Sequence, residues 1–231
     1  MPFRVHHRYD AANFSRTSGI AAINAVSGGT ILDPQDRHQF LNFSGVVLGG
    51  LALIAIGLGW AVEIDPLSKL SWSWRAFGWG LAGTLPLFVL FAAVYRLPIG
   101  EFRTIRKFLS TELAPSLAVL TWFDLVFLAV LTGIAEELFF RGLLESWMAS
   151  DRFPWVGRVA ASFLFGLAHL VTLTYGLMTF VVGLYLSWLM TWVDPPNLLI
   201  PIVTHAVYDY GGFLIIIWLH RRDVPAVEKS R

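Results

Sequence analysis

One apolar stretch decides the fold. Residues 117–148 read LAVLTWFDLVFLAVLTGIAEELFFRGLLESWM. The run exceeds the roughly 20 residues that a helix needs to cross a bilayer, so the helix must tilt or extend beyond the lipid. Its interior nevertheless holds Glu136, Glu137 and Arg141. Charged side chains are costly in lipid and are usually functional there, so the stretch predicts a transmembrane helix that carries a site.

The rest of the chain has a similar character. Of its 231 residues, 56% are hydrophobic and only 14% are charged, whereas soluble domains carry roughly 25% charged residues. Further apolar runs predict five more spans, at residues 44–62, 77–97, 155–173, 175–193 and 198–219. The expected fold class is therefore all-α, a polytopic membrane bundle of about six transmembrane helices.

The distribution of apolar and polar residues divides the chain into four parts. Residues 1–43 form a polar N-terminal arm that includes an expected loop, DPQDRHQF, at residues 33–40. Residues 44–116 supply two accessory spans and an amphipathic helix suited to the membrane surface. Residues 117–219 form the core with the buried charges, and residues 220–231 form a polar tail. The chain has no cysteine, which excludes disulfides and thiolate catalysis, and its net charge of +1 gives no indication of a nucleic-acid partner.

Lysine and arginine are distributed unevenly between the two sides of the predicted bundle. If the N-terminus is cytoplasmic, twelve of these residues lie in inner segments and four in outer segments. The twelve are Arg4, Arg8, Arg16, Arg37, Arg96, Arg103, Arg106, Lys107, Arg221, Arg222, Lys229 and Arg231, and the four are Lys69, Arg75, Arg152 and Arg158. The positive-inside rule then predicts that both termini are cytoplasmic, in an integral, multi-pass protein that we expect in a bacterial inner membrane.

Ionisable residues also occur in two other spans. FLFGLAHL ends in His169, and THAVYDY contains His205 and Asp209. With a rise of about 1.5 Å per residue, Glu136 lies about 18 Å from the outer end of its span, His169 about 21 Å and His205 about 10 Å. These depths are compatible with one cluster.

Helical spacing assigns faces within the cluster. Glu137 and Arg141 are four residues apart and can pair, whereas Glu136 points about 100° away and is left without that partner. His205 and Asp209 are also four apart, so the carboxylate can orient the imidazole or contact a substrate.

Each of these features also has a purely structural interpretation. A Glu–Arg pair can simply join helices, and a single histidine in a membrane is more often a hydrogen-bond donor between helices than a catalyst. A spare glutamate at the depth of two histidines favours catalysis instead. Glu145 and Asp151, close to the outer interface, are expected to be solvated.

Together these residues resemble the CAAX prenyl protease and bacteriocin-processing (CPBP, or Abi) family, which includes the Ras-converting CAAX endopeptidases. The family's Glu-Glu-x-x-x-Arg motif is matched by Glu136, Glu137 and Arg141. Its Phe-x-x-x-His motif is matched by Phe165 and His169, and its His-x-x-x-Asn/Asp motif by His205 and Asp209. The resemblance covers about residues 117–219 and is most specific at EELFFRGLL.

The resemblance implies an intramembrane endopeptidase of the glutamic type that cleaves a membrane-associated peptide or protein. Glu136 and His169 would activate the attacking water, His205 and Asp209 would hold the scissile carbonyl and its oxyanion, and Arg141 would fix Glu137. The Ras-converting members have Asn where this chain has Asp209. A carboxylate cannot donate to an oxyanion unless it is protonated, so Asp209 can alternatively orient His205.

Two other functions fit the same residues. Glu136, His169 and His205 are competent zinc ligands, which leaves a metalloprotease open, although the HExxH pattern is missing. A non-enzymatic scaffold or immunity protein could use the same polar cavity to bind a partner. The expectation is an enzyme without a metal or other cofactor, and substitution of Glu136 by Gln separates an enzyme from a scaffold.

Overall fold

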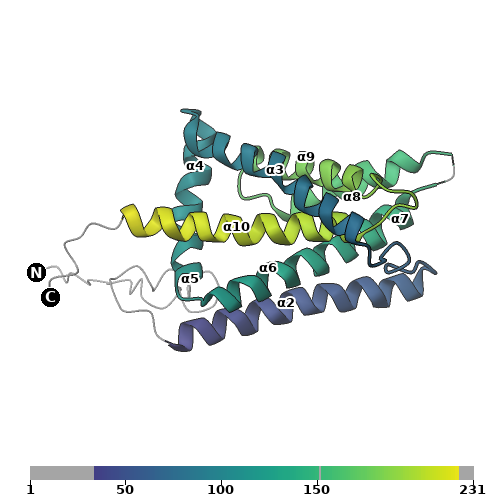
Figure 1. Ribbon diagram of the computed structural model, residues 1–231, viewed down its shortest axis with the longest axis horizontal. Coiled ribbons are helices and arrows are strands. Elements are labelled where there is room, and N and C mark those ends of the chain that lie inside the picture. Colours follow the sequence, from purple (N-terminus) through teal and green to yellow (C-terminus); the bar gives the residue numbers. More distant parts are fainter. Residues whose placement is uncertain (1–33, 151, 224–231) are drawn as a thin grey trace, which may run out of the picture. The chain divides into compact units, whose positions relative to one another are not determined.

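The computed structural model describes residues 34–150 and 152–223. They are helical, with no strand among them, so the predicted all-α class is confirmed (Figure 1). The elements are α2 (Pro34–Ala61), α3 (Trp74–Arg96), α4 (Gly100–Phe108), η1 (Leu109–Leu113), α5 (Ala114–Ala118), α6 (Trp122–Glu137), η2 (Leu138–Leu144), α7 (Glu145–Met148), α8 (Pro154–Ala168), α9 (Leu173–Leu189) and α10 (Leu199–Asp223). Most of the predicted arm (1–33), Asp151 and most of the tail (224–231) lie outside the described residues.

A helix was found for each of the six predicted spans, but not all are long enough to cross a bilayer. By length and composition, α2, α3 and α10 can span a membrane. A fourth candidate is the bent pair Gly100–Ala118 and Trp122–Met148. Helices α8 and α9 are apolar but have only 15 and 17 residues, short of the roughly 20 that a perpendicular span needs. The described residues thus support three or four candidate spans, fewer than the six predicted.

The first of the described helices, α2, begins earlier than the sequence pattern indicated. The expected loop at residues 33–40 is helical from Pro34 onward, so that prediction was wrong. Proline is favoured at the first position of a helix because its missing N–H has no intrahelical partner there. Arg37, three residues later, donates two hydrogen bonds of 2.7 Å to Asp124 of α6, and this bidentate ion pair stabilises the added turns.

The predicted third span is also interrupted. The chain bends by 119° between Ala118 and Trp122, because a new helix begins there. Thr121 accepts a hydrogen bond from the Asp124 backbone, and the Asp124 carboxylate accepts one from the Thr121 backbone, a capping box. The core helix therefore starts at Trp122 instead of residue 117.

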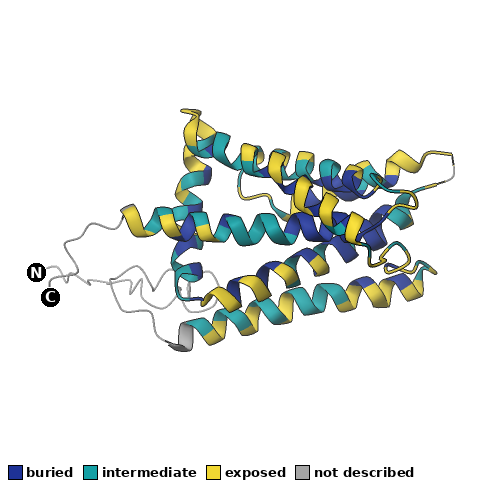
Figure 2. Ribbon diagram, viewed as in Figure 1, coloured by how far each residue is buried: buried dark blue, intermediate teal, exposed yellow. Residues whose placement is uncertain are grey.

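Helix α10 lies between α3 and α6, and α8 packs along α9 (Figure 1). Small residues permit the close approach of α3 to α10, as is common between membrane helices. Thr204 of α10 donates to the Gly80 carbonyl of α3 at 2.8 Å, and a β-carbon at Gly80 would overlap Val203. Buried residues gather along this contact and around η2, whereas α2 is mostly exposed (Figure 2).

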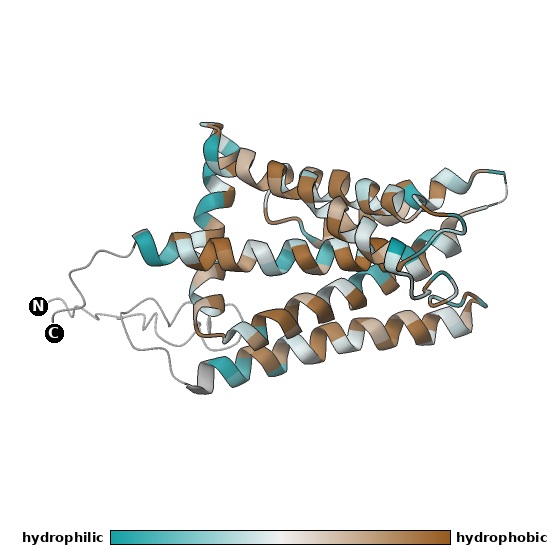
Figure 3. Cartoon of the chain, in the orientation of Figure 1, coloured by the Kyte–Doolittle hydropathy of each residue, from teal (hydrophilic) through white to brown (hydrophobic). Residues whose placement is uncertain are grey.

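The exposed faces are strongly apolar. Val46 and Leu53 of α2 and Val89 of α3 are each at least 70% exposed, and apolar residues line the outer faces of these helices (Figure 3). So much exposed hydrocarbon would be unfavourable in water and is expected in lipid.

The segment between α2 and α3 attaches to the start of α10. Asn197 donates to the Ser71 carbonyl and hydroxyl oxygens, both at 2.9 Å, and the Leu198 N–H donates to the Lys69 carbonyl at 2.8 Å. Asn197 is buried. These bonds hold the N-terminal end of α10 in place, seven residues before His205.

Candidate active site

Three helices bring the predicted site residues together. Glu136 lies in the last turn of α6, His169 directly follows α8, and His205 lies in α10. The Glu136 Oε2 atom is 3.9 Å from His169 Nε2 and 3.8 Å from His205 Nε2. Glu136 therefore lies between the two imidazoles.

The adjacent glutamate has a different environment. Arg141 Nη1 donates to Glu137 Oε1 at 2.9 Å, and both side chains are fully buried. Arg141 also donates to the Gly183 carbonyl of α9 at 3.1 Å. The predicted pairing of Glu137 with Arg141 is confirmed, and Arg141 links η2 to α9 as well.

Glu137 has a second partner that sequence spacing did not reveal. His205 Nδ1 lies 2.8 Å from Glu137 Oε1, the oxygen that Arg141 also contacts. The other ring nitrogen, Nε2, faces Glu136 at 3.8 Å and Asp209 Oδ2 at 3.6 Å. The short hydrogen bond that orients His205 is thus made with Glu137, while Asp209 lies beside the nitrogen that faces Glu136.

The orientation of His169 follows from its backbone contact. His169 Nδ1 lies 2.9 Å from the Phe165 carbonyl oxygen. Because a carbonyl only accepts, Nδ1 must carry the proton and donate. In a neutral imidazole, Nε2 is then the unprotonated nitrogen, and this is the atom that faces Glu136.

The Phe165 ring contacts two residues of the site, His169 and Arg141. Its ring centroid is 4.5 Å from that of His169, and the Arg141 guanidinium lies over the same ring at 4.5 Å from its centroid. A cation over an aromatic face is favourable, most of all away from water. Phe165 is buried and therefore fixes a histidine and an arginine at once.

The two glutamates stand where the helix changes its winding. Helix α6 ends at Glu137, and the following segment η2, which contains Arg141, is a π-helix. Hydrogen bonds that run i→i+5 widen the helix, and such turns are frequent at functional sites. Arg141 lies inside this segment and contacts Glu137 at its start.

The oxygen of Glu136 that faces the histidines has no partner among the described residues. Glu136 Oε2 is buried and accepts no hydrogen bond, although the side chain as a whole is 14% exposed. The gaps of 3.8 and 3.9 Å exceed a direct hydrogen bond. A water molecule beside these atoms could contact a carboxylate and an imidazole together, which is the arrangement that general-base activation of water requires.

The described residues contain no group of three or more His, Asp or Glu arranged to hold a metal ion.

One residue near the site was wrongly assigned to solvent. Glu145 is buried, with 6% of its surface exposed, and one of its carboxylate oxygens is 3.7 Å from Arg158 Nε of α8. The spacing in the sequence is consistent with this burial, because Glu145 lies four residues after the buried Arg141 and so shares its face of the helix.

Residues 118–211 match a family model, Type II CAAX prenyl endopeptidase Rce1-like. The resemblance to the CPBP family is confirmed. The matched region contains all seven site residues described above, from Glu136 to Asp209. No curated protein and no solved structure was found to match the chain.

The match supports a membrane-embedded peptide hydrolase that acts on a membrane-associated peptide. The Rce1-like family is a protease family, and the apolar helices indicate an integral membrane protein. The matched region begins in α5 and ends in α10, so residues 34–117 lie outside it.

Proposed function

We propose that this chain is an intramembrane endopeptidase of the glutamic type, in which Glu136 and His169 activate water without a metal ion. The observation that carries the proposal is the unpartnered, buried Glu136 Oε2 between two imidazole nitrogens. A bacterial inner membrane is the proposed location, with the basic segments on the cytoplasmic side.

The attacking water would lie between Glu136 and His169. It would donate one hydrogen bond to Glu136 Oε2 and the other to His169 Nε2, which the Phe165 carbonyl leaves unprotonated in the neutral ring. As the water oxygen bonds to the scissile carbonyl carbon, its proton passes to Glu136. The same proton then moves to the leaving amine when the C–N bond breaks.

His205 and Asp209 would act on the substrate carbonyl. Glu137 accepts from His205 Nδ1 and thereby directs Nε2 toward Glu136. With a proton on Nε2, His205 could donate to the oxyanion that forms during attack. Asp209, 3.6 Å from the same nitrogen, would hold that proton in place, or would itself donate if protonated.

A zinc-dependent protease and a non-catalytic scaffold remain the alternatives to test. The metal-free mechanism is preferred to zinc because a carboxylate beside two imidazoles can activate water without a metal ion. The buried ion pair by itself would suit a scaffold, but a scaffold gives no reason for an unpaired carboxylate oxygen facing two histidines.

Comparative membrane proteomics tests the proposal directly. Cells that carry the native chain are compared with cells that carry Glu136→Gln, which keeps the size of the side chain and removes its basicity. We expect uncleaved membrane peptides to accumulate only with Glu136→Gln. Glu101→Gln is the matched control, because Glu101 is an exposed residue of α4. Equal peptide profiles for native and Glu136→Gln cells would exclude a protease.

A further inference from the structure

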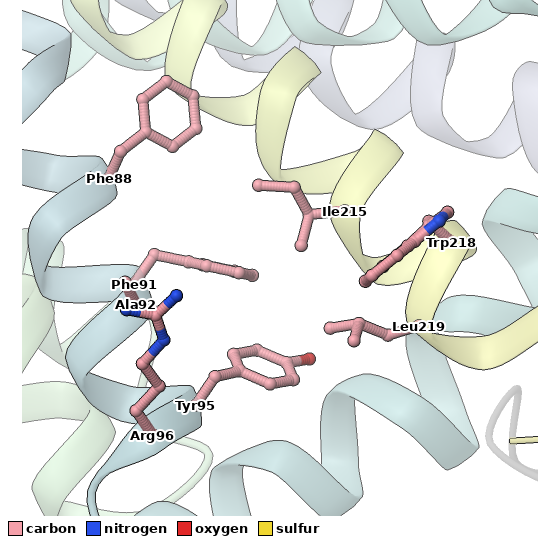
Figure 4. Close-up of a pocket in the computed structure, with 8 residues that line it drawn as sticks. All are labelled: Phe88, Phe91, Ala92, Tyr95, Arg96, Ile215, Trp218 and Leu219. Carbon is pink, nitrogen blue, oxygen red and sulfur yellow. The ribbon is translucent and has the colours of Figure 1, made fainter. Parts of the chain in front are cut away.

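A groove lies away from the glutamates. It is an open groove of about 600 Å³ between α3 and α10, lined by Phe88, Phe91, Ala92, Tyr95, Arg96, Ile215, Trp218 and Leu219. Its volume lies within the range of about 300–1,000 Å³ typical of small-molecule sites. Figure 4 shows the rings of Phe91 and Tyr95 on one side, with Trp218 and Leu219 facing them from α10.

The groove occupies a different face of α10 from the catalytic cluster. Tyr208, Ile215 and Leu219 follow each other at spacings of seven and four residues and so share a face. Tyr208 packs against Phe88 with ring centroids 5.7 Å apart. Around the helix, His205 lies about 60° and Asp209 about 100° from Tyr208, and His205 faces Glu136 and Glu137. None of the residues lining the groove belongs to the catalytic cluster.

Two arginines are associated with this apolar groove, Arg96 as a lining residue and Arg222 through its contact with Trp218. Arg96, the last residue of α3, lines it and is exposed. Arg222, in the last turn of α10, places its guanidinium 4.2 Å from the centroid of the Trp218 ring. No ion pair joins either arginine to an acidic residue in the described part of the chain. Arg106 of α4 is already engaged, because it donates to the Val94 and Leu97 carbonyls.

We propose that the groove between α3 and α10 binds an anionic phospholipid, with an acyl chain against the aromatic lining and the phosphate between Arg96 and Arg222. Both parts of such a lipid can bind here. The acyl chain packs on the apolar lining, and the guanidinium groups donate paired hydrogen bonds to the phosphate oxygens. The site is separate from the proposed protease centre and does not depend on it.

Native mass spectrometry of the detergent-solubilised full chain tests the site. The probes are phosphatidylglycerol and phosphatidylcholine with identical acyl chains, added in equal amounts. We expect the native protein to retain phosphatidylglycerol about tenfold better, the factor that corresponds to one charged hydrogen bond. The double variant Arg96→Ala/Arg222→Ala should lose this preference, and Arg96→Lys should keep part of it.

Three further variants test whether the lipid preference depends on the groove and not on surface charge or on catalysis. Arg103→Ala removes an exposed arginine of α4 that does not line the groove, and it should leave the preference unchanged. Ala92→Leu places a larger side chain in the groove and should reduce the retention of both lipids. Glu136→Gln, which is expected to be inactive, should bind lipid like the native protein.

Several outcomes would overturn the site. One is equal retention of the two lipids by the native chain. Another is that Arg103→Ala loses the preference as fully as Arg96→Ala/Arg222→Ala does, which would mean that the lipid responds to the overall surface charge and not to this groove. A third is stoichiometric displacement of phosphatidylglycerol by a prenylated peptide, which would make the groove part of the substrate site.

Discussion

At the scale of single residues, the site consists of two neighbouring glutamates with opposite environments. Helical spacing predicted the Glu137–Arg141 pair, and the 100° between neighbouring residues predicted that Glu136 would be free of it. The contact between Glu137 and His205 could not be predicted, because it joins α6 to α10 across 68 positions of the chain and depends on how these helices pack.

The two glutamates should differ in their effect on stability. Glu137→Ala leaves the buried Arg141 without its carboxylate and removes the acceptor for His205, with an expected loss of about 3–5 kcal/mol. Among the described residues, Glu136→Gln removes no hydrogen bond or short ion pair, so the variant should unfold close to the native temperature. Thermal unfolding in detergent measures both. A larger drop in Tm for Glu136→Gln would mean that the roles of the two residues are reversed.

The reaction should also proceed without a metal ion. Carboxylate and imidazole groups can activate water directly, and Glu136 lies close to both histidines. Purified enzyme dialysed against a strong chelator should therefore keep its peptidase activity, and elemental analysis should find no stoichiometric metal. Activity that disappears on chelation and returns with zinc alone would establish the metalloprotease instead.

At the scale of helices, the hydrophobic runs of the sequence predicted where the apolar helices lie. The residues at which these helices begin and end depend instead on capping hydrogen bonds and ion pairs. The break before Trp122 follows from the Thr121–Asp124 capping box, whose two residues lie within an apolar run of the sequence. The start of α2 at Pro34 depends on an ion pair with Asp124, 87 residues away from Arg37. The π-helical turn of η2 has no composition that distinguishes it from an α-helix.

The position of η2 depends on a glycine. A β-carbon on Gly142 would overlap the Pro66 carbonyl oxygen, which is backbone and cannot rotate away. Gly142→Ala should therefore displace either η2 or the segment after α2, at a cost of about 1–3 kcal/mol, and should lower cleavage because Arg141 is adjacent.

Gly45→Ala is the matched control for this substitution. No atom lies within 4 Å of the position of its β-carbon, so the substitution should be neutral or stabilising by at most about 1 kcal/mol. Denaturation of both variants in the same detergent gives the comparison. Equal stabilities would show that the contact with Pro66 does not constrain η2.

At the scale of the whole molecule, the described helices define an apolar bundle whose orientation in the membrane is a prediction from charge. Both termini and the segment around Arg103 should be cytoplasmic, and the segment around Trp72 external. The chain has no cysteine, so single cysteines introduced at positions 72, 103 and 225 can be labelled on intact cells. Only position 72 should react with an impermeant reagent, and strong labelling at position 103 or 225 would reverse the assignment.

The ion pair between Arg37 and Asp124 has a consequence for how this protein can be divided. The family match begins at residue 118, yet the partly buried carboxylate at the start of α6 is neutralised by α2, and the turn before α10 is held by Lys69 and Ser71. The region that matches the family model is thus smaller than the region that must fold together. A chimera joined at residue 118 would contain the catalytic motifs but lack Arg37, Lys69 and Ser71, which hold α6 and α10 in place. A transplantable unit therefore has to begin at or before Pro34.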